Sequence, residues 1–159
     1  MIKVLFVCLG NICRSPLAEG HFVKLISDNH FESVIRCDSA GTAGYHIGEL
    51  ADLRTRKNAQ EHGLELVHKA RQFSGKDFND FDYILVMDES NLRNIALIKS
   101  DLKETKAQLF KMRYFDYEFK NEDVPDPYYE SEKGFEDVYQ ILKLSTFNFM
   151  EFLKKEHNF

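Results

Sequence analysis

Tryptophan is absent from the 159-residue chain, and proline and cysteine occur only three times each. No apolar run approaches the roughly 20 residues that a membrane-spanning helix needs. The apolar stretch over residues 4–9 is short, ends at Gly10-Asn11 and is followed by no small-residue cleavage site, so we interpret it as a buried strand. An odd number of cysteines without a secretion signal is typical of the reducing cytoplasm. We therefore expect a cytoplasmic protein that does not engage a membrane.

Positive charge is also scarce, because 21 Lys and Arg residues face 26 Asp and Glu residues, which gives a net charge of −5. A nucleic-acid-binding protein needs a basic face, so the composition argues against nucleic acid as a partner. An anionic substrate remains compatible with this charge, because the field inside a site can oppose that of the whole molecule.

Several functional signatures are missing as well. A nucleotide-binding loop needs Gly, four residues and then Gly-Lys-Ser/Thr, whereas Gly75-Lys76 is followed by Asp77 and position 70 is alanine. The six histidines form no recognisable metal-ligand spacing, so we expect neither a metal nor a cofactor. Repeats, low-complexity tracts and linkers are absent, and the length suits one domain over residues 1–159.

What the chain does contain is an alternation of strand-like and helix-like segments. Apolar runs predict strands over residues 2–8, 33–39, 81–87 and 108–112. Helical spacing predicts a helix that opens at Ser15-Pro16 and further helices over 53–62, 89–99 and 135–155, with an acidic loop over 116–132. Such alternation indicates an α/β fold with a parallel sheet and helices on both faces. Ligands of these sheets bind at the carboxyl ends of the strands, where Cys8 is expected.

Residues 8–15 combine groups that suit an oxyanion. Cys8 ends the first strand, Arg14 follows after five intervening residues, and Ser15 is expected to cap the helix that Pro16 begins. Backbone N–H groups of the loop and of the first helical turn would point at the anion, and the helix dipole favours its charge. The same field favours the nucleophilic thiolate of Cys8. The guanidinium of Arg14 matches two phosphate oxygens.

The segment Val7–Pro16 closely resembles the signature of the low-molecular-weight protein tyrosine phosphatases, and Asp126-Pro127-Tyr128-Tyr129 resembles the general-acid loop of that family. Residues 38–42, 68–72 and 81–88 match as well, so the resemblance covers essentially the whole chain. It implies a doubly wound, four-stranded parallel sheet with a phosphate-binding loop after the first strand. It also implies hydrolysis of phosphotyrosine and aryl phosphates through a cysteinyl-phosphate, with a phosphotyrosine protein as partner.

Three residues carry the expected chemistry. Cys8 would attack phosphorus, and Arg14 would hold two phosphate oxygens through the transition state. Asp126 would protonate the leaving phenolate and, once ionised, would activate water. Asp-Pro is also a common turn starter, and Asp123 is a weaker rival for the acid.

The remaining members of the predicted phosphate-binding loop are Leu9, Gly10, Asn11, Ile12, Cys13 and Ser15. Ser15 could donate a hydrogen bond to the thiolate of Cys8. Gly10 and Asn11 both tolerate the positive φ that an inward-curling loop requires. In the resembling family, the asparagine at this place holds the loop through side-chain hydrogen bonds.

The resemblance further assigns supporting roles around the loop to Ser39, His68 and Asp88. Each residue has a structural alternative. Ser39 could simply end a strand, His68 could be an ordinary hydrogen-bonded histidine, and Asp88 could cap the helix that follows it.

Leu9, Tyr45, Tyr128 and Tyr129 are expected to wall the substrate cleft. An apolar slot favours an aromatic ester through ring contacts worth about 0.5–1.5 kcal/mol, and phosphoserine is too short to reach a cysteine at its floor. The family usually carries tryptophan where Tyr45 stands, and the tyrosine pair can be phosphorylated. Residues 48–54 lack the prolines common in relatives, which predicts a loop that is more mobile or more helical.

Cys13 stands beside the expected thiolate, which favours a reversible Cys8–Cys13 disulfide as a redox control. Cys37 lies in a predicted strand and is expected to pack. The ligands expected of the loop are phosphate and similar oxyanions, and the protein is expected to be a monomer or a weak dimer.

Two other activities use the same fold and loop. Arsenate reductases need two further cysteines around the region that matches residues 77–94, and the chain has none after Cys37. Protein-arginine phosphatases carry threonine where Ile12 stands. A phosphoprotein-binding module without catalysis is a third alternative, but it would not need both Cys8 and Asp126.

Overall fold

Strand β1 (Ile2–Cys8) lies inside a four-stranded parallel sheet with the strand order β2-β1-β3-β4. The computed structural model describes all of residues 1–159. The other strands are β2 (Ile35–Gly41), β3 (Tyr83–Val86) and β4 (Gln108–Lys111). Parallel strands covered on both faces appear in a sequence as near-continuous apolar runs, which explains the apolar composition of β1 and β3. The predicted α/β fold with a four-stranded parallel sheet is confirmed.

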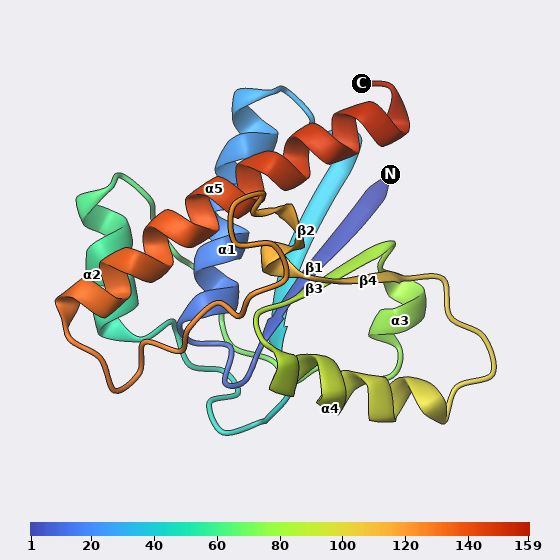
Figure 1. Cartoon of the computed structure of the whole chain (residues 1–159), viewed down its shortest axis with the longest axis horizontal. Coiled ribbons are helices and arrows are strands. Elements are labelled where there is room, and N and C mark those ends of the chain that lie inside the picture. The colour runs from blue at the N-terminus through green and yellow to red at the C-terminus, as the bar shows by residue number, and fades with distance from the viewer.

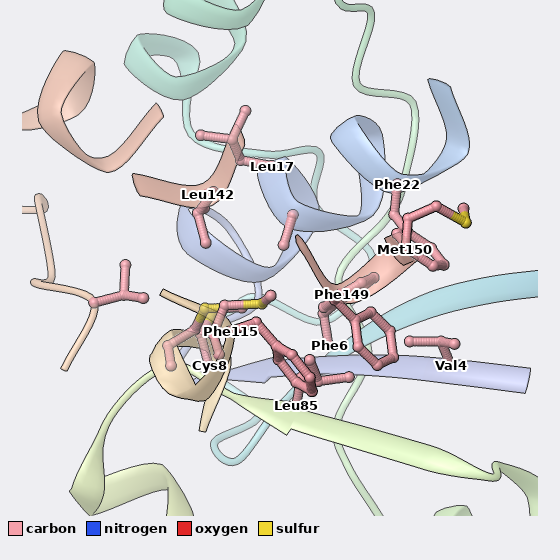
Figure 2. Close-up of a cluster of buried hydrophobic side chains, with 14 of the residues drawn as sticks. Val4, Phe6, Cys8, Leu17, Phe22, Leu85, Phe115, Leu142, Phe149 and Met150 are labelled. Atoms are coloured by element: carbon pink, nitrogen blue, oxygen red, sulfur yellow. The ribbon is translucent and has the colours of Figure 1, made fainter. Parts of the chain in front are cut away.

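Helices cover both faces of the sheet (Figure 1). They are α1 (Arg14–Asp28), α2 (Leu53–Glu61), α3 (Asp77–Asp80), α4 (Glu89–Ser100), α5 (Glu132–His157) and the 3-10 helix η1 (Met112–Phe115). Alternate side chains of β1 point to opposite faces. Phe6 joins the larger core with residues of α1 and α5, and Cys8 lies at one end of this core, near Phe115 (Figure 2). Leu5 and Val7 join the smaller core with residues of α3 and α4.

Some element boundaries differ from the predicted ones. β2 begins at Ile35, because the Val34 N–H donates to the Phe31 carbonyl and closes a turn before it. α5 begins at Glu132, about one turn before its first buried apolar residue, Phe135. The helices α3 and η1 have no predicted counterpart, because four residues are too few to show helical periodicity.

The carboxyl ends of the strands mark one end of the molecule. β1 pairs with β2 on one side and with β3 on the other, so this edge is the switch point at which doubly wound sheets bind ligands. The loop after β1, the segment before α2 and the segment before α5 all lie at this end (Figure 1). No helix of the protein is both long and apolar enough to span a membrane.

Candidate active site

The loop after β1 curls around the sulfur of Cys8. Asn11 adopts a left-handed conformation with φ of 56°, and its backbone N–H points at Cys8 Sγ at 3.3 Å. Asparagine tolerates this conformation better than most residues. Gly10 also tolerates a positive φ, but in the loop only Asn11 adopts one. Glycine at position 10 instead leaves room for His46, whose Cδ2 would lie 3.3 Å from an added Cβ.

Ser15 lies inside α1, where its hydroxyl faces the sulfur of Cys8. Its Oγ is 3.0 Å from Cys8 Sγ and accepts a hydrogen bond from Asn11 Nδ2 at 2.8 Å. Its hydrogen has two acceptors within reach, Cys8 Sγ at 3.0 Å and the Ala40 carbonyl at 3.5 Å, and the sulfur is the nearer. The prediction that Ser15 caps the helix is wrong. α1 begins at Arg14, and its N-cap residue Cys13 forms no side-chain capping bond.

Arg14 is buried, and its guanidinium is held at the mouth of the loop by three acceptors. Nη1 donates to Asp88 Oδ2 at 2.6 Å and to the Val124 carbonyl at 2.9 Å, and Nη2 reaches Asp126 Oδ2 at 3.5 Å. Burial alone would lower the pKa of Arg14. The negative charges of Cys8, Asp88 and Asp126 outweigh it and raise the pKa, so the side chain stays charged.

Asp88 serves two structures at once. Its Oδ1 accepts from the Asn91 N–H at 2.8 Å, and the Asn91 side chain accepts from the Asp88 N–H, which completes a capping box at the start of α4. Its Oδ2 binds Arg14. The two readings of Asp88, helix cap and neighbour of the loop, therefore describe the same side chain.

Asp126 is far less restrained than Asp88. Its side chain is 44% exposed, and its Oδ1 accepts from the Tyr128 N–H at 3.1 Å, as expected of an aspartate that opens a turn. Asp123 points elsewhere, because it accepts from the Glu89 N–H at 3.0 Å and pairs with Lys111 at 2.7 Å. Of the two acids, only Asp126 lies in the pocket above Cys8.

The pocket encloses about 280 Å³ above the loop. Its lining residues are Cys8, Leu9, Gly10, Ile12, Cys13, Arg14, Tyr45, His46, Asp126, Tyr128 and Tyr129. The four predicted wall residues are therefore all present. Tyr45 and Tyr129 are 77% and 95% exposed, so these rings can still pack against a ligand.

Residues 3–158 match the family model for the low molecular weight phosphotyrosine protein phosphatase. The chain belongs to this phosphatase family. It is 47% identical over 138 residues to the low molecular weight phosphotyrosine protein phosphatases of Gallus gallus and of Homo sapiens, and the matches cover 87% of each chain. The protein is accordingly a hydrolase of the protein tyrosine phosphatase type.

Solved structures agree with this membership. A protein tyrosine phosphatase from Entamoeba histolytica, crystallised with Hepes in the active site, superposes with a TM-score of 0.88 at 42% identity over 99% of each chain. A Drosophila arginine phosphatase has the same TM-score at 31% identity, and the match covers 96% of this chain and 98% of the other.

In this low molecular weight phosphatase, Asn11 is the hub that joins the loop to the sheet. Its Nδ2 donates to Ser39 Oγ at 3.0 Å, and its Oδ1 accepts from His68 Nε2 at 2.8 Å and from the Arg71 N–H at 3.0 Å. Ser39 lies inside β2 and not at its end. The structure thus brings Ser39 and His68 to the loop through one side chain.

A layer of charges that the sequence analysis missed lies behind this hub. Ser39 Oγ donates to Glu19 Oε2 at 2.6 Å, and His68 Nδ1 lies 3.2 Å from the same oxygen and 3.4 Å from Asp38 Oδ1. Arg71 Nε donates to Asp38 Oδ2 at 2.8 Å. Glu19 falls four residues after Ser15 on the same face of α1, which is the signal that could have identified it.

Burial shifts the protonation of two of these groups. It raises the pKa of Glu19 to about 7, although the bond from Ser39 opposes the rise. Burial also lowers the pKa of His68, against the attraction of Asp38. Near neutral pH, Glu19 can therefore hold a proton that His68 does not.

Arg54 is a further residue missed from the sequence, and it anchors the loop that carries Asp126. Its Nη1 donates to the Tyr128 carbonyl at 2.8 Å, and its guanidinium lies 5.2 Å from the centre of the Tyr128 ring. Asp52 caps α2 and pairs with Arg54 at 2.9 Å, so the start of α2 is held by an ion pair to a residue of its own first turn.

Proposed function

We propose that Cys8 is the nucleophile, Arg14 the binder of the phosphoryl oxygens, and Asp126 the general acid of this phosphatase. One observation carries the proposal: Cys8 lies beneath the pocket that Arg14 and Asp126 also line, and Nη2 of Arg14 is 3.5 Å from Asp126 Oδ2. A thiolate, a bidentate cation and a carboxyl group are what the transfer of a phosphoryl group to sulfur requires.

In the first step the Cys8 thiolate forms a sulfur–phosphorus bond while the bond from phosphorus to the aryl oxygen breaks. Asp126 gives its proton to that oxygen, and the phenol leaves. Arg14 and the loop N–H groups stabilise the charge on the three phosphoryl oxygens, the kind of contribution that is usually the largest in catalysis.

In the second step Asp126, now ionised, takes a proton from water as the water oxygen attacks phosphorus. The sulfur–phosphorus bond breaks and the Cys8 thiolate leaves. A hydrogen bond from Ser15 stabilises this thiolate. Inorganic phosphate is the product, and these steps use side chains and backbone of the chain alone.

The pocket supports an aryl phosphoester as the substrate. Leu9, Ile12 and the rings of Tyr45, Tyr128 and Tyr129 offer an apolar wall around a floor that binds phosphate or a similar oxyanion. A phosphotyrosine side chain spans this depth, whereas phosphoserine does not bring its phosphorus to Cys8. The isoleucine at position 12 favours phosphotyrosine over phosphoarginine.

We also propose that oxidation silences the enzyme reversibly. A peroxide would oxidise the Cys8 thiolate to a sulfenic acid, and the Cys13 thiol would then displace water to form a Cys8–Cys13 disulfide. Both residues line one pocket, and burial raises the pKa of Cys13 to about 12, so Cys13 keeps its proton until it reacts. Peroxide inactivation that dithiothreitol fails to reverse, with no disulfide in the peptide map, would contradict this control.

We infer a cytoplasmic enzyme, because three free cysteines suit a reducing compartment. We further infer, from the net charge of −5, that the enzyme binds no nucleic acid. We also propose a monomer or a weak dimer that does not engage membranes.

The first experiment measures phosphate release from a phosphotyrosine peptide by the reduced protein, in excess chelator. Release by the native protein and none by Cys8→Ser is the expected result, since serine cannot replace the thiolate at neutral pH. Equal release by both proteins would contradict the role of Cys8. No release by folded native protein would contradict the proposed function itself.

A further inference from the structure

Two segments frame the mouth of the pocket, and both are acidic. Residues 43–54 contribute Tyr45 and His46 to its lining, and residues 121–132 contribute Asp126, Tyr128 and Tyr129. We call these two segments the rim. Their carboxylates are Glu49, Asp52, Glu122, Asp123, Asp126, Glu130 and Glu132, and Arg54 is their only Lys or Arg.

Five of the seven rim carboxylates lie near a Lys or Arg, and two do not. Asp52 pairs with Arg54 at 2.9 Å, Asp123 with Lys111 at 2.7 Å and Asp126 with Arg14 at 3.5 Å. Looser pairs join Glu122 to Arg113 and Glu132 to Lys57, each at 3.8 Å. Glu49 contacts only a histidine, His46, at 2.7 Å, and 61% of the Glu49 side chain is exposed. Glu130 directly follows the exposed Tyr129, is exposed itself, and forms no ion pair.

Two carboxylates of the rim influence the pKa of a group inside the pocket. Burial is the main reason for the raised pKa of Cys13, and the negative charges of Asp52 and Asp126 add to it. The floor of the pocket is cationic through Arg14, while its mouth is anionic. A phosphate is therefore attracted to the floor of the pocket, whereas groups of the substrate that stay outside the pocket lie near the negative charges of the rim.

The residues beside a phosphotyrosine stay outside. A pocket of about 280 Å³ holds one aryl phosphate, and successive residues of an extended peptide advance by only about 3.3–3.6 Å. The two neighbours on either side therefore lie over the rim, within about one Debye length of its carboxylates at physiological salt.

We propose that the rim selects phosphotyrosine peptides with basic neighbouring residues and disfavours those with acidic ones. This inference rests on the proposed function, because it concerns the substrates of the same pocket. Complementary charge of this kind acts mainly on the rate of encounter and on the choice of partner. Its effect is therefore expected in kcat/KM, and it weakens as the salt concentration rises.

The test compares two peptides that are identical except for the two residues on each side of phosphotyrosine, which are Lys in one and Glu in the other. At low ionic strength we expect kcat/KM to be about tenfold higher for the Lys peptide, and the ratio to fall toward one in 0.5 M NaCl. Phenyl phosphate, which has no neighbours, serves as the reference substrate.

Two double variants carry the same change of net charge. Glu49→Lys with Glu130→Lys alters the rim, whereas Glu32→Lys with Glu104→Lys alters exposed residues that precede β2 and β4, at the opposite end of the sheet. The rim variant should reduce the Lys-to-Glu preference at least threefold, and the matched control should keep the native ratio.

A native ratio of threefold or less overturns the inference, and so does an equal fall of the ratio in both variants. If phenyl phosphate is hydrolysed in either case, the proposed function survives the failure. If neither phenyl phosphate nor any peptide is hydrolysed, the proposed function fails and the inference fails with it.

Discussion

The Asp126 side chain is less buried and held by fewer contacts than that of Arg14 in the same pocket. Arg14 is buried and held by three acceptors, whereas the Asp126 side chain is 44% exposed and bonds only the Tyr128 N–H and Arg14. A carboxyl group that must carry a proton to the leaving oxygen and later take one from water benefits from such access to solvent.

Replacing Asp126 by Ala should therefore affect poor leaving groups most. We expect kcat/KM for phenyl phosphate, which reports the step that releases the phenol, to fall about 10²–10³-fold, because an unassisted phenolate of high basicity has to leave. For an ester with a good leaving group such as p-nitrophenol, the loss should be at least tenfold smaller. Steady-state kinetics with both esters measure the two losses. Equal losses would contradict the role of Asp126 as the general acid.

At the residue scale, the sequence predicted the residues that line the pocket but not all of the residues that hydrogen-bond to the groups around it. Cys8 and Arg14 could be named from the chemical reason for their spacing, whereas Asp126 was named through the resemblance to the phosphatase family. Glu19 and Arg54 were missed, because charged residues on helices are usually solvated. The spacing of Glu19 from Ser15 places it on the right face of α1, but only the tertiary structure shows that it reaches Ser39 and that Arg54 reaches the Tyr128 carbonyl.

At the scale of elements, Asp88 joins the start of α4 to the loop after β1, and its two functions are separable. Asp88→Asn keeps an oxygen for the Asn91 N–H but presents an amide to Arg14, whereas Asp88→Ala loses both contacts. We expect the Ala variant to be about 1 kcal/mol less stable than the Asn variant, which is the usual value of a helix cap.

Both Asp88 variants should share the loss of activity, because Arg14 loses its shortest acceptor in each. Urea unfolding and the kinetics of phenyl phosphate hydrolysis give the two readouts. Native activity in the Asn variant would show that Asp88 acts on α4 alone.

All four strands and the helices of nine or more residues were predicted, whereas the two four-residue helices were missed. The run of β1 and the stripe of α5 extend over 7 and 26 residues, so their patterns are plain. α3 and η1 have four residues each, and their positions depend on the packing of Phe78 and Phe115 into the two cores, which a local pattern does not contain. The strand order follows from the family resemblance and not from periodicity.

At the scale of the whole molecule, the contact between α1 and α5 contains a buried histidine. His21 is 6% exposed, its Nε2 has no hydrogen-bond partner, and its ring lies 4.6 Å from that of Tyr139. Burial, with a smaller repulsion from Lys143, lowers the pKa of His21 to about 4.

Acid should therefore weaken the fold through His21. The unfolded chain takes up a proton near pH 6.5 while the folded chain resists it until about pH 4, so this contribution to stability is complete above pH 6.5 and is lost as pH falls toward 4. The size of the loss is about 3 kcal/mol for a fully buried group.

Urea unfolding at pH 5 and pH 7 measures this effect, with His21→Leu as the comparison. The variant should lose less stability between the two pH values than the native protein does. Glu19 acts in the opposite sense, because its raised pKa adds stability that is lost as pH rises through about 7, and it is the same in both proteins. An unchanged pH dependence in His21→Leu would exclude the histidine as the cause.

The order of the chain has a consequence for the way the enzyme is made. The thiol at position 8 leaves the ribosome early, whereas Asp126 and the Val124 carbonyl that holds Arg14 come near the end. At a synthesis rate of about 5–20 residues per second, the interval between them is on the order of ten seconds. During that time a nascent chain carries the thiol without the carboxyl group that we propose as its acid, so full turnover of phosphotyrosine is expected only after translation has passed the last loop.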